Sequence, residues 1–287
     1  MDKIFLTECP RDAMQGIKEF IPTDTKIKYL NLLLKCGFDI LDFGSFVSPK
    51  AIPQLQDTSA VLDQLDLSNS NTELLAIVLN ERGAKEALNY SEISFLGMPF
   101  SISETFQQRN GNSSIEENLQ RLEQIQNLAV KANRKLLIYI SMAFGNPYGD
   151  LWNTEIALQW TERISQMGIE YISLADTIGS STPDSISYIF NALIPAFPKV
   201  KFGAHLHTTS ATWEEKVNAA YSSGVRRFDG ALKGFGGCPM ASDKLTGNMP
   251  TEQLYGWINS QGLAYWLDPN YLGESMAIAS DLFTTYH

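Results

Sequence analysis

The stretch "YISLADTIGSSTPDSI", residues 171–186, contains one complete strand, loop and helix start. Its first part, "YISLA" (171–175), is a short apolar run of the kind that forms a buried strand. Thr182 is a favourable helix N-cap, and Pro183 after it suits the first helical position. Asp176 follows the strand directly. The stretch therefore predicts a βα unit with an acidic side chain at the carboxyl end of its strand.

The same alternation of short apolar runs and longer segments of helical period extends along the chain. Eight βα repeats in about 250 residues favour a closed (β/α)8 TIM barrel over an open doubly wound sheet. No G-x-G-x-x-G follows the first strand to indicate a dinucleotide fold. We expect strands near residues 3–7, 38–43, 74–79, 92–97, 135–141, 171–175, 201–207 and 225–230.

We therefore expect an α/β chain with one TIM-barrel domain over residues 1–287, in which the barrel takes about 3–250 and a C-terminal helical extension about 251–287. Ser113 and Glu116 have the spacing of a capping box for the helix that follows. The aromatic segment 254–272 is predicted to be helical and to pack on the barrel or on a neighbouring subunit.

The composition indicates a globular protein, with 44% hydrophobic and 19% charged residues. No apolar run approaches the roughly 18 to 20 residues that cross a bilayer. Strand-like sequence begins almost at the first residue, so we expect no cleavable signal and a cytoplasmic location. Cys9, Cys36 and Cys238 form an odd set at unrelated spacings, which indicates reduced thiols.

A formal net charge of −10 argues against a general nucleic-acid surface and against binding to anionic membranes. An anionic substrate would then need a local cationic cluster inside a pocket. Lys18 and Lys50 are candidate phosphate partners near the first two loops, although lone lysines are usually just solvated.

The stretch "GAHLHTTSA" (203–211) holds two of the three histidines of the chain, His205 and His207. Residues i and i+2 of a strand face the same side, so both rings can meet one ion or substrate. An ordinary exposed strand explains the spacing equally well. The pair therefore needs further ligands before it indicates a metal site.

Other polar residues lie at predicted carboxyl ends of strands, where a TIM barrel carries its functional groups. Asp12, His205, His207 and the Asn248 carbonyl would form a mixed oxygen and nitrogen set that suits Mg²⁺ or, with two imidazoles, Mn²⁺ or another transition metal. Absence of C-x-x-C spacing argues against structural zinc. Alternatively, Arg11 and Asp12 form a surface ion pair, although adjacent strand residues point to opposite sides. The polar residues at these ends are Arg11, Asp12, Asp42, Asp176, His205, His207, Cys238 and Asn248.

Five motifs together resemble the 3-hydroxy-3-methylglutaryl-CoA lyases, in the family's order and across residues 5 to about 255. The related isopropylmalate and homocitrate synthases share the Arg-Asp and H-x-H elements, whereas "SFVSPK" and the glycine-rich loop resemble the lyase branch. The motifs are "PRDAMQ" (10–15), "SFVSPKAIPQ" (45–54), "ADTIGSSTP" (175–183), "HLH" (205–207) and "GFGGCPMASDKLTGNMPTE" (234–252).

The resemblance implies a metal-dependent cleavage of 3-hydroxy-3-methylglutaryl-CoA into acetyl-CoA and acetoacetate, and it suggests a homodimer. Arg11 matches the residue that stabilises the enolate. Cys238 matches a mobile-loop cysteine proposed to take part in proton transfer, and the alternative is a packed loop thiol. Asp42 and Asp176 match acidic residues important to the site. The matching metal ligands are Asp12, His205, His207 and Asn248, and we count Asp12 and His205 among the catalytic residues as well.

The chain also departs from the family pattern. Ala13 and Met14 replace Gly-Leu, Asp42 replaces Glu, and Thr208 replaces the Asp that follows the second histidine. The shorter Asp42 is expected to need a shifted backbone or a water to make its hydrogen bond. A lyase for a related branched 3-hydroxyglutaryl-CoA, a condensing synthase and a metal-binding scaffold without catalysis are the alternative functions.

Overall fold

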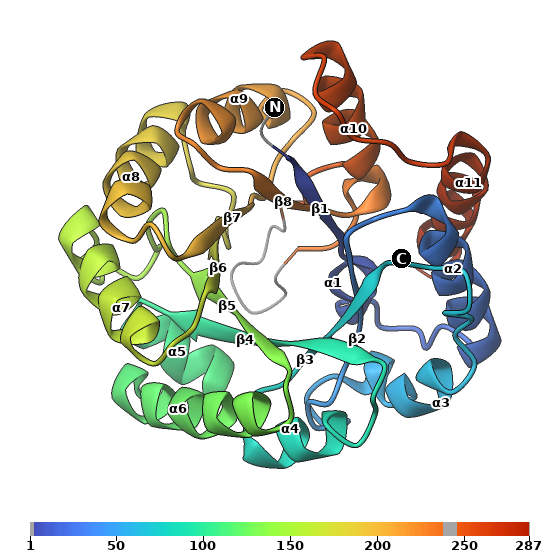
Figure 1. Cartoon of the computed structure of the whole chain (residues 1–287), viewed down its shortest axis with the longest axis horizontal. Coiled ribbons are helices and arrows are strands. Elements are labelled where there is room, and N and C mark those ends of the chain that lie inside the picture. The colour runs from blue at the N-terminus through green and yellow to red at the C-terminus, as the bar shows by residue number, and fades with distance from the viewer. Residues whose placement is uncertain (1–2, 238–245, 287) are drawn as a thin grey trace.

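The computed structural model describes residues 3–237 and 246–286. Within them, eight parallel strands close into a barrel in chain order, and β8 pairs with β1 (Figure 1). The expected (β/α)8 barrel is therefore confirmed. The strands are β1 (Phe5–Glu8), β2 (Ile40–Ser45), β3 (Glu73–Ile77), β4 (Ile93–Ser101), β5 (Lys135–Ser141), β6 (Tyr171–Ala175), β7 (Lys201–His205) and β8 (Arg227–Gly230).

Helices surround the barrel and follow the strands one after another (Figure 1). No helix among the described residues is both long and apolar enough to span a membrane. The helices are α1 (Pro10–Gln15), α2 (Thr23–Cys36), η1 (Pro53–Leu55), α3 (Thr58–Leu62), α4 (Glu81–Ala87), α5 (Glu104–Gly111), α6 (Ile115–Lys131), α7 (Thr154–Gln166), α8 (Pro183–Ala196), α9 (Trp213–Ser222), η2 (Leu232–Gly234), α10 (Thr251–Ser260) and α11 (Pro269–Thr285).

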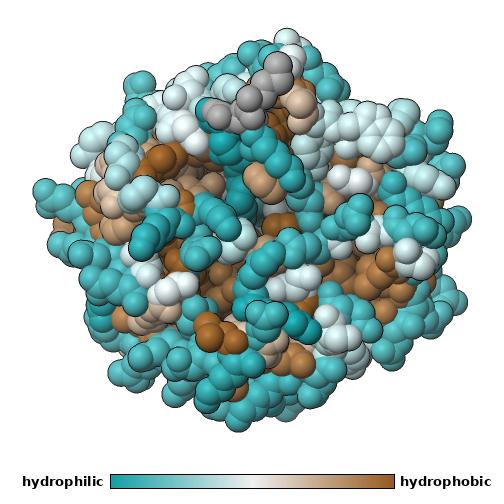
Figure 2. Space-filling model, in the orientation of Figure 1, coloured by the Kyte–Doolittle hydropathy of each residue, from teal (hydrophilic) through white to brown (hydrophobic). Residues whose placement is uncertain are grey.

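The C-terminal segment forms the expected helical extension and packs on the barrel layer. Helix α11 lies beside α2 in Figure 1, and the Asp268 N–H that precedes it donates to the Cys36 carbonyl at 2.8 Å. Trp257 of α10 is buried, and its indole N–H donates to Asn218 of α9. Most of the face visible in Figure 2 is hydrophilic, with smaller apolar patches between the polar side chains.

Two helix starts test the capping predictions. Thr182 is the N-cap of α8 with Pro183 at the first helical position, as the sequence predicts. The predicted Ser113–Glu116 box is wrong by one residue, because α6 is capped by Ser114, which exchanges hydrogen bonds with Glu117. Both pairs have the S-x-x-E spacing, so the pattern alone does not choose between them. Ser113 is instead buried and accepts a hydrogen bond from Gln107.

The interior of the barrel is apolar on one side and polar on the other. An apolar cluster joins inward residues of β2 to β5, among them Leu75, Phe95 and Tyr139. Gly97 makes room for it, since a Cβ there would lie 2.6 Å from the Ile77 side chain. Strands β6 to β8 instead carry buried polar side chains. These are Ser173, His205, Arg227 and Asp229.

Glu8, the last residue of β1, connects the barrel to the C-terminal segment. Its side chain is fully buried and accepts hydrogen bonds from the Leu232 N–H at 2.9 Å and the Thr251 hydroxyl at 2.5 Å. Burial raises the pKa of Glu8 from 4.5 to about 8, although both hydrogen bonds oppose the shift. The folded protein therefore holds a proton on Glu8 at neutral pH.

This proton predicts a stability change with pH. Between pH 4.5 and about 8 the folded state keeps a proton that the unfolded chain loses. The free energy of unfolding from this group therefore falls by about 1.4 kcal/mol per pH unit as the pH rises. We expect Glu8→Gln to remove that slope, measured by thermal unfolding from pH 5 to 8. Glu81→Gln, which changes an exposed carboxylate on α4, is the control, and equal slopes in both variants would contradict the shift.

Candidate active site

Arg11 and Asp12 are placed by a short helix directly after β1. Pro10 occupies the first position of α1, where its missing N–H costs no hydrogen bond, and both charged residues follow within the first turn. Both are buried, and Arg11 Nη1 lies 2.9 Å from Asp12 Oδ1. The expectation that these neighbours point to opposite sides is wrong, because it assumed strand geometry. They form a buried ion pair at the barrel mouth.

Asp42 of β2 fixes the other side of the same guanidinium. Arg11 Nε donates to both Asp42 oxygens at 3.2 and 3.0 Å, and Nη2 donates to Oδ2 at 2.6 Å. The contact is direct, and β2 shifts its register against β3 between Asp42 and Gly44. Burial alone would lower the pKa of Arg11, but Asp42 and Asp12 together raise it. The guanidinium is thus a permanent cation held between two carboxylates.

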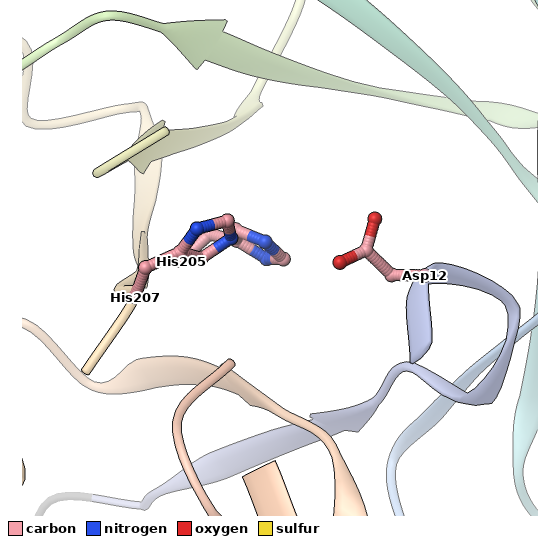
Figure 3. Close-up of side chains that lie close together, drawn as sticks. All are labelled: Asp12, His205 and His207. Carbon is pink, nitrogen blue, oxygen red and sulfur yellow. The ribbon is translucent and has the colours of Figure 1, made fainter. Parts of the chain in front are cut away.

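The two histidines converge with Asp12. Strand β7 ends at His205, and His207 follows it in an isolated antiparallel bridge with Asn248. The two ring centroids are 5.4 Å apart, and both rings extend toward the Asp12 carboxylate (Figure 3). One ligand atom from each of the three buried residues lies within 4.8 Å of the other two. This geometry is compatible with a shared metal ion.

The protonation of Asp12 and His207 suits metal binding. Burial alone would raise the pKa of Asp12, but Arg11 and the two histidines lower it to about 2. Burial lowers the pKa of His207 to about 4, and His205 adds to that effect. For His205, burial is outweighed by Asp229 and Asp12, which raise its pKa. At neutral pH the site therefore offers an ionised carboxylate and a neutral His207 imidazole.

Asn248 lies beside this cluster, as the sequence predicts. Its Nδ2 donates to Asp12 Oδ2 at 2.8 Å and to the Phe235 carbonyl at 2.9 Å. Both contacts use the amide nitrogen, which leaves the side-chain oxygen of Asn248 available as a ligand among the described residues. Thr208, next in the chain to His207, is buried, and its hydroxyl donates weakly to the Asn248 backbone carbonyl at 3.4 Å.

Asp176 belongs to a separate buried cluster behind the histidines. Its Oδ2 lies 2.7 Å from Lys216 Nζ and also accepts the Ser181 hydroxyl. The Lys216 ammonium donates further to the carbonyls of His207, at 2.9 Å, and Gly179. This cluster therefore ties the loops after β6 and β7 together and holds the backbone of His207.

A cavity of about 130 Å³ opens over the cluster, and Arg11, Gln15, Tyr139 and Thr177 are among its lining residues. Lys18 and Lys50 are exposed, in the segment after α1 and the loop after β2. Cys238, the predicted mobile-loop cysteine, lies outside the described residues.

Sequence reasoning missed several residues that the fold brings to this site. Gln15 accepts a hydrogen bond from Arg11 Nη1 at 2.7 Å. The sequence could have identified it, because Gln15 is the last residue of the motif "PRDAMQ". Lys216 in "WEEKVNAA" reads as a solvated helix residue yet is buried. Tyr139 packs edge-on against His205, with centroids 5.5 Å apart. Asp229 approaches His205 from the neighbouring strand, and no local pattern marks it.

Comparison with known proteins finds hydroxymethylglutaryl-CoA lyases among the relatives of this chain. The sequence matches the model of the HMGL-like family over residues 3–280. Hydroxymethylglutaryl-CoA lyase of Bacillus subtilis is 36% identical over 245 residues, which cover 85% of this chain and 81% of the relative.

Two solved structures are similar over nearly the whole chain. The crystal structure of the Bacillus subtilis HMG-CoA lyase has a TM-score of 0.92 at 30% identity and covers 99% of this chain and 95% of its own. An HMG-CoA lyase from Acinetobacter baumannii, in complex with coenzyme A and 3-methylmalate, has a TM-score of 0.90 at 28% identity, with coverages of 98% and 92%.

The Lys216–Asp176 pair gives a stability prediction. Lys216→Met would leave the Asp176 carboxylate buried without its cation, which typically costs about 3–5 kcal/mol. We expect urea unfolding to show a loss on that scale. The double variant Lys216→Met/Asp176→Asn should recover part of it, since no charge is then left unpaired. A single variant as stable as the parent would show that the pair does not hold these loops.

Proposed function

The chain belongs to the HMGL-like family, and from that membership we propose that it cleaves 3-hydroxy-3-methylglutaryl-CoA into acetyl-CoA and acetoacetate with a divalent cation. The observation that carries the proposal is the convergence of Asp12, His205 and His207, with ligand atoms within 4.8 Å of one another, beside the buried guanidinium of Arg11. A cation site next to a fixed positive charge suits a reaction in which negative charge develops on two substrate oxygens.

The donor set fits a divalent cation. One carboxylate and two imidazoles, joined by the Asn248 side-chain oxygen, would hold Mn²⁺ or Mg²⁺ and leave octahedral positions open for substrate. A bound cation of this kind lowers the pKa of an alcohol oxygen and neutralises charge that develops on it. In the proposed reaction that oxygen is the C3 hydroxyl of the substrate.

Arg11 is proposed to stabilise the enolate that forms when the C2–C3 bond breaks. Of its five N–H groups, four donate to Asp42, Asp12 and Gln15, through Nε, Nη1 and one hydrogen of Nη2. The second Nη2 hydrogen remains for a substrate oxygen. The carboxylates fix the guanidinium before substrate arrives, so little reorganisation is needed as charge builds on the thioester oxygen.

The residues at which this chain departs from the family pattern give no reason to propose a different acyl group. Ala13, Met14, Asp42 and Thr208 are all buried, and none of them lines the cavity at the barrel mouth. They therefore change the support of the site and not the surface that substrate meets. We propose Lys18 and Lys50 as partners for the phosphates of coenzyme A. Cys238 as a proton-transfer residue, a dimeric assembly and a cytoplasmic location are also part of the proposal.

The central test uses the purified chain with metal removed by a chelator. We expect no acetoacetate from 3-hydroxy-3-methylglutaryl-CoA until Mn²⁺ or Mg²⁺ is added, because the C3 hydroxyl is otherwise too weak an acid. Acetoacetate formation without any metal would contradict the metal-dependent mechanism. Condensation of acetyl-CoA with a keto acid in place of cleavage would identify a synthase.

The enolate role predicts a rate loss in Arg11→Gln. We expect kcat to fall by at least about 10²–10³-fold, the scale of one lost oxyanion donor. Arg11→Gln leaves the buried Asp42 carboxylate without its cation and can destabilise the fold. The double variant Arg11→Gln/Asp42→Asn removes that unpaired charge and is used for the same measurement. Arg163→Gln, which removes a partly exposed arginine on α7, is the control. Parental turnover in a folded Arg11 variant would exclude this role.

A further inference from the structure

Asp229 is a buried carboxylate that forms no ion pair with a lysine or arginine among the described residues. It is 2% exposed on β8, and among the described residues neither oxygen accepts a regular hydrogen bond. Arg227, two residues earlier on the same strand, donates instead to the Lys201 carbonyl and the Ser173 hydroxyl. An unpaired buried carboxylate is costly, so its position needs an explanation.

His205 faces Asp229 from the neighbouring strand. The two residues are register partners on adjacent strands β7 and β8, and Asp229 Oδ2 lies 3.3 Å from His205 Nδ1. Tyr139 of β5 packs edge-on against the His205 ring, at an interplanar angle of 77°. The ring is thus confined by an aromatic neighbour and faces a carboxylate with one of its two nitrogens.

This contact decides which His205 nitrogen can bind a cation. A carboxylate oxygen accepts, so the Nδ1 that faces it must carry the hydrogen, and the lone pair of neutral imidazole is then on Nε2. We propose that Asp229 is the positioning residue for His205, holding the ring in the Nδ1–H tautomer so that Nε2 is the atom offered to the metal shared with Asp12 and His207. The inference rests on the metal site of the proposed function.

His207 provides an internal contrast. Its Nδ1 is also buried, and it has no hydrogen-bond partner among the described residues. The backbone of His207 is instead held through its carbonyl, which accepts from Lys216. The two ligands are therefore supported differently, and loss of Asp229 should act through His205 alone.

Metal affinity is the first measurement. Outer partners of metal-ligating histidines typically contribute about 10–100-fold in affinity. We expect Mn²⁺ titration of metal-free protein to show that loss for Asp229→Ala, and a smaller loss for Asp229→Asn, whose amide oxygen still accepts from Nδ1–H. Glu8→Gln, which changes a buried carboxyl of the neighbouring strand β1, should bind Mn²⁺ as tightly as the parent. His207→Ala shows how much affinity is lost when a ligand itself is removed.

The tautomer is the second measurement, and it does not depend on catalysis. The chain has three histidines, so long-range ¹H–¹⁵N spectra of metal-free protein are simple to assign with His207→Ala and His287→Ala. At alkaline pH, where the His205 ring is neutral, we expect the Nδ1–H tautomer in the parent and a shift toward Nε2–H in Asp229→Ala.

Parental Mn²⁺ affinity in folded Asp229→Ala, or an Nε2–H tautomer in the parent, would overturn the assignment. If metal binds and acetoacetate is not formed, the proposed substrate fails while the role of Asp229 stands on these two readouts. If the parent binds no divalent cation, the proposed function fails, and the tautomer spectrum alone decides whether Asp229 orients the ring.

Discussion

Closure of the barrel through β8 is the constraint on which the site depends. Strand β8 pairs with β7 on one side and with β1 on the other, and Asp229 is the register partner of both His205 and Thr7. Asp12 follows β1 within one helical turn, so this pairing brings it within reach of histidines from the far end of the chain. The candidate ligands and Asp229 thus come from three adjacent strands of the barrel or from the segments directly after them.

The charges of this half of the barrel favour an added cation. Asp12, Asp42 and Asp229 are buried carboxylates, and Arg11 pairs with the first two, whereas Asp229 faces His205. Buried charge is stable when it is paired or coordinates a metal. A divalent cation between Asp12 and the histidines would add positive charge beside these carboxylates.

The parts of this structure that local sequence determines were predictable. All eight strands overlap the runs that predict them, although β7 ends at His205 and not at the predicted residue 207, and β4 extends beyond the predicted residue 97 to Ser101. Thr182 caps α8 because an N-cap followed by proline is a local signal. The start of α6 at Ser114 was missed because neighbouring serines share the same spacing. Helix α1 was not predicted, although Pro10 suits the first position of a helix. By contrast, Lys216 and Asp229 acquire their roles from partners on other βα units, so only the closed barrel identifies them.

An irregularity of strand β2 lies next to Asp42. The register of β2 against β3 shifts between Asp42 and Gly44, so Phe43 is the extra residue of a bulge. Bulges re-aim the side chains next to them. Gly44 permits this one to pack closely, since a Cβ there would lie 2.6 Å from the Thr58 side chain. The resulting contact to Arg11, at 2.6 Å, needs no water. Asp42 therefore reaches Arg11 directly from this irregular strand, and the guanidinium stays fixed beside the candidate metal ligands.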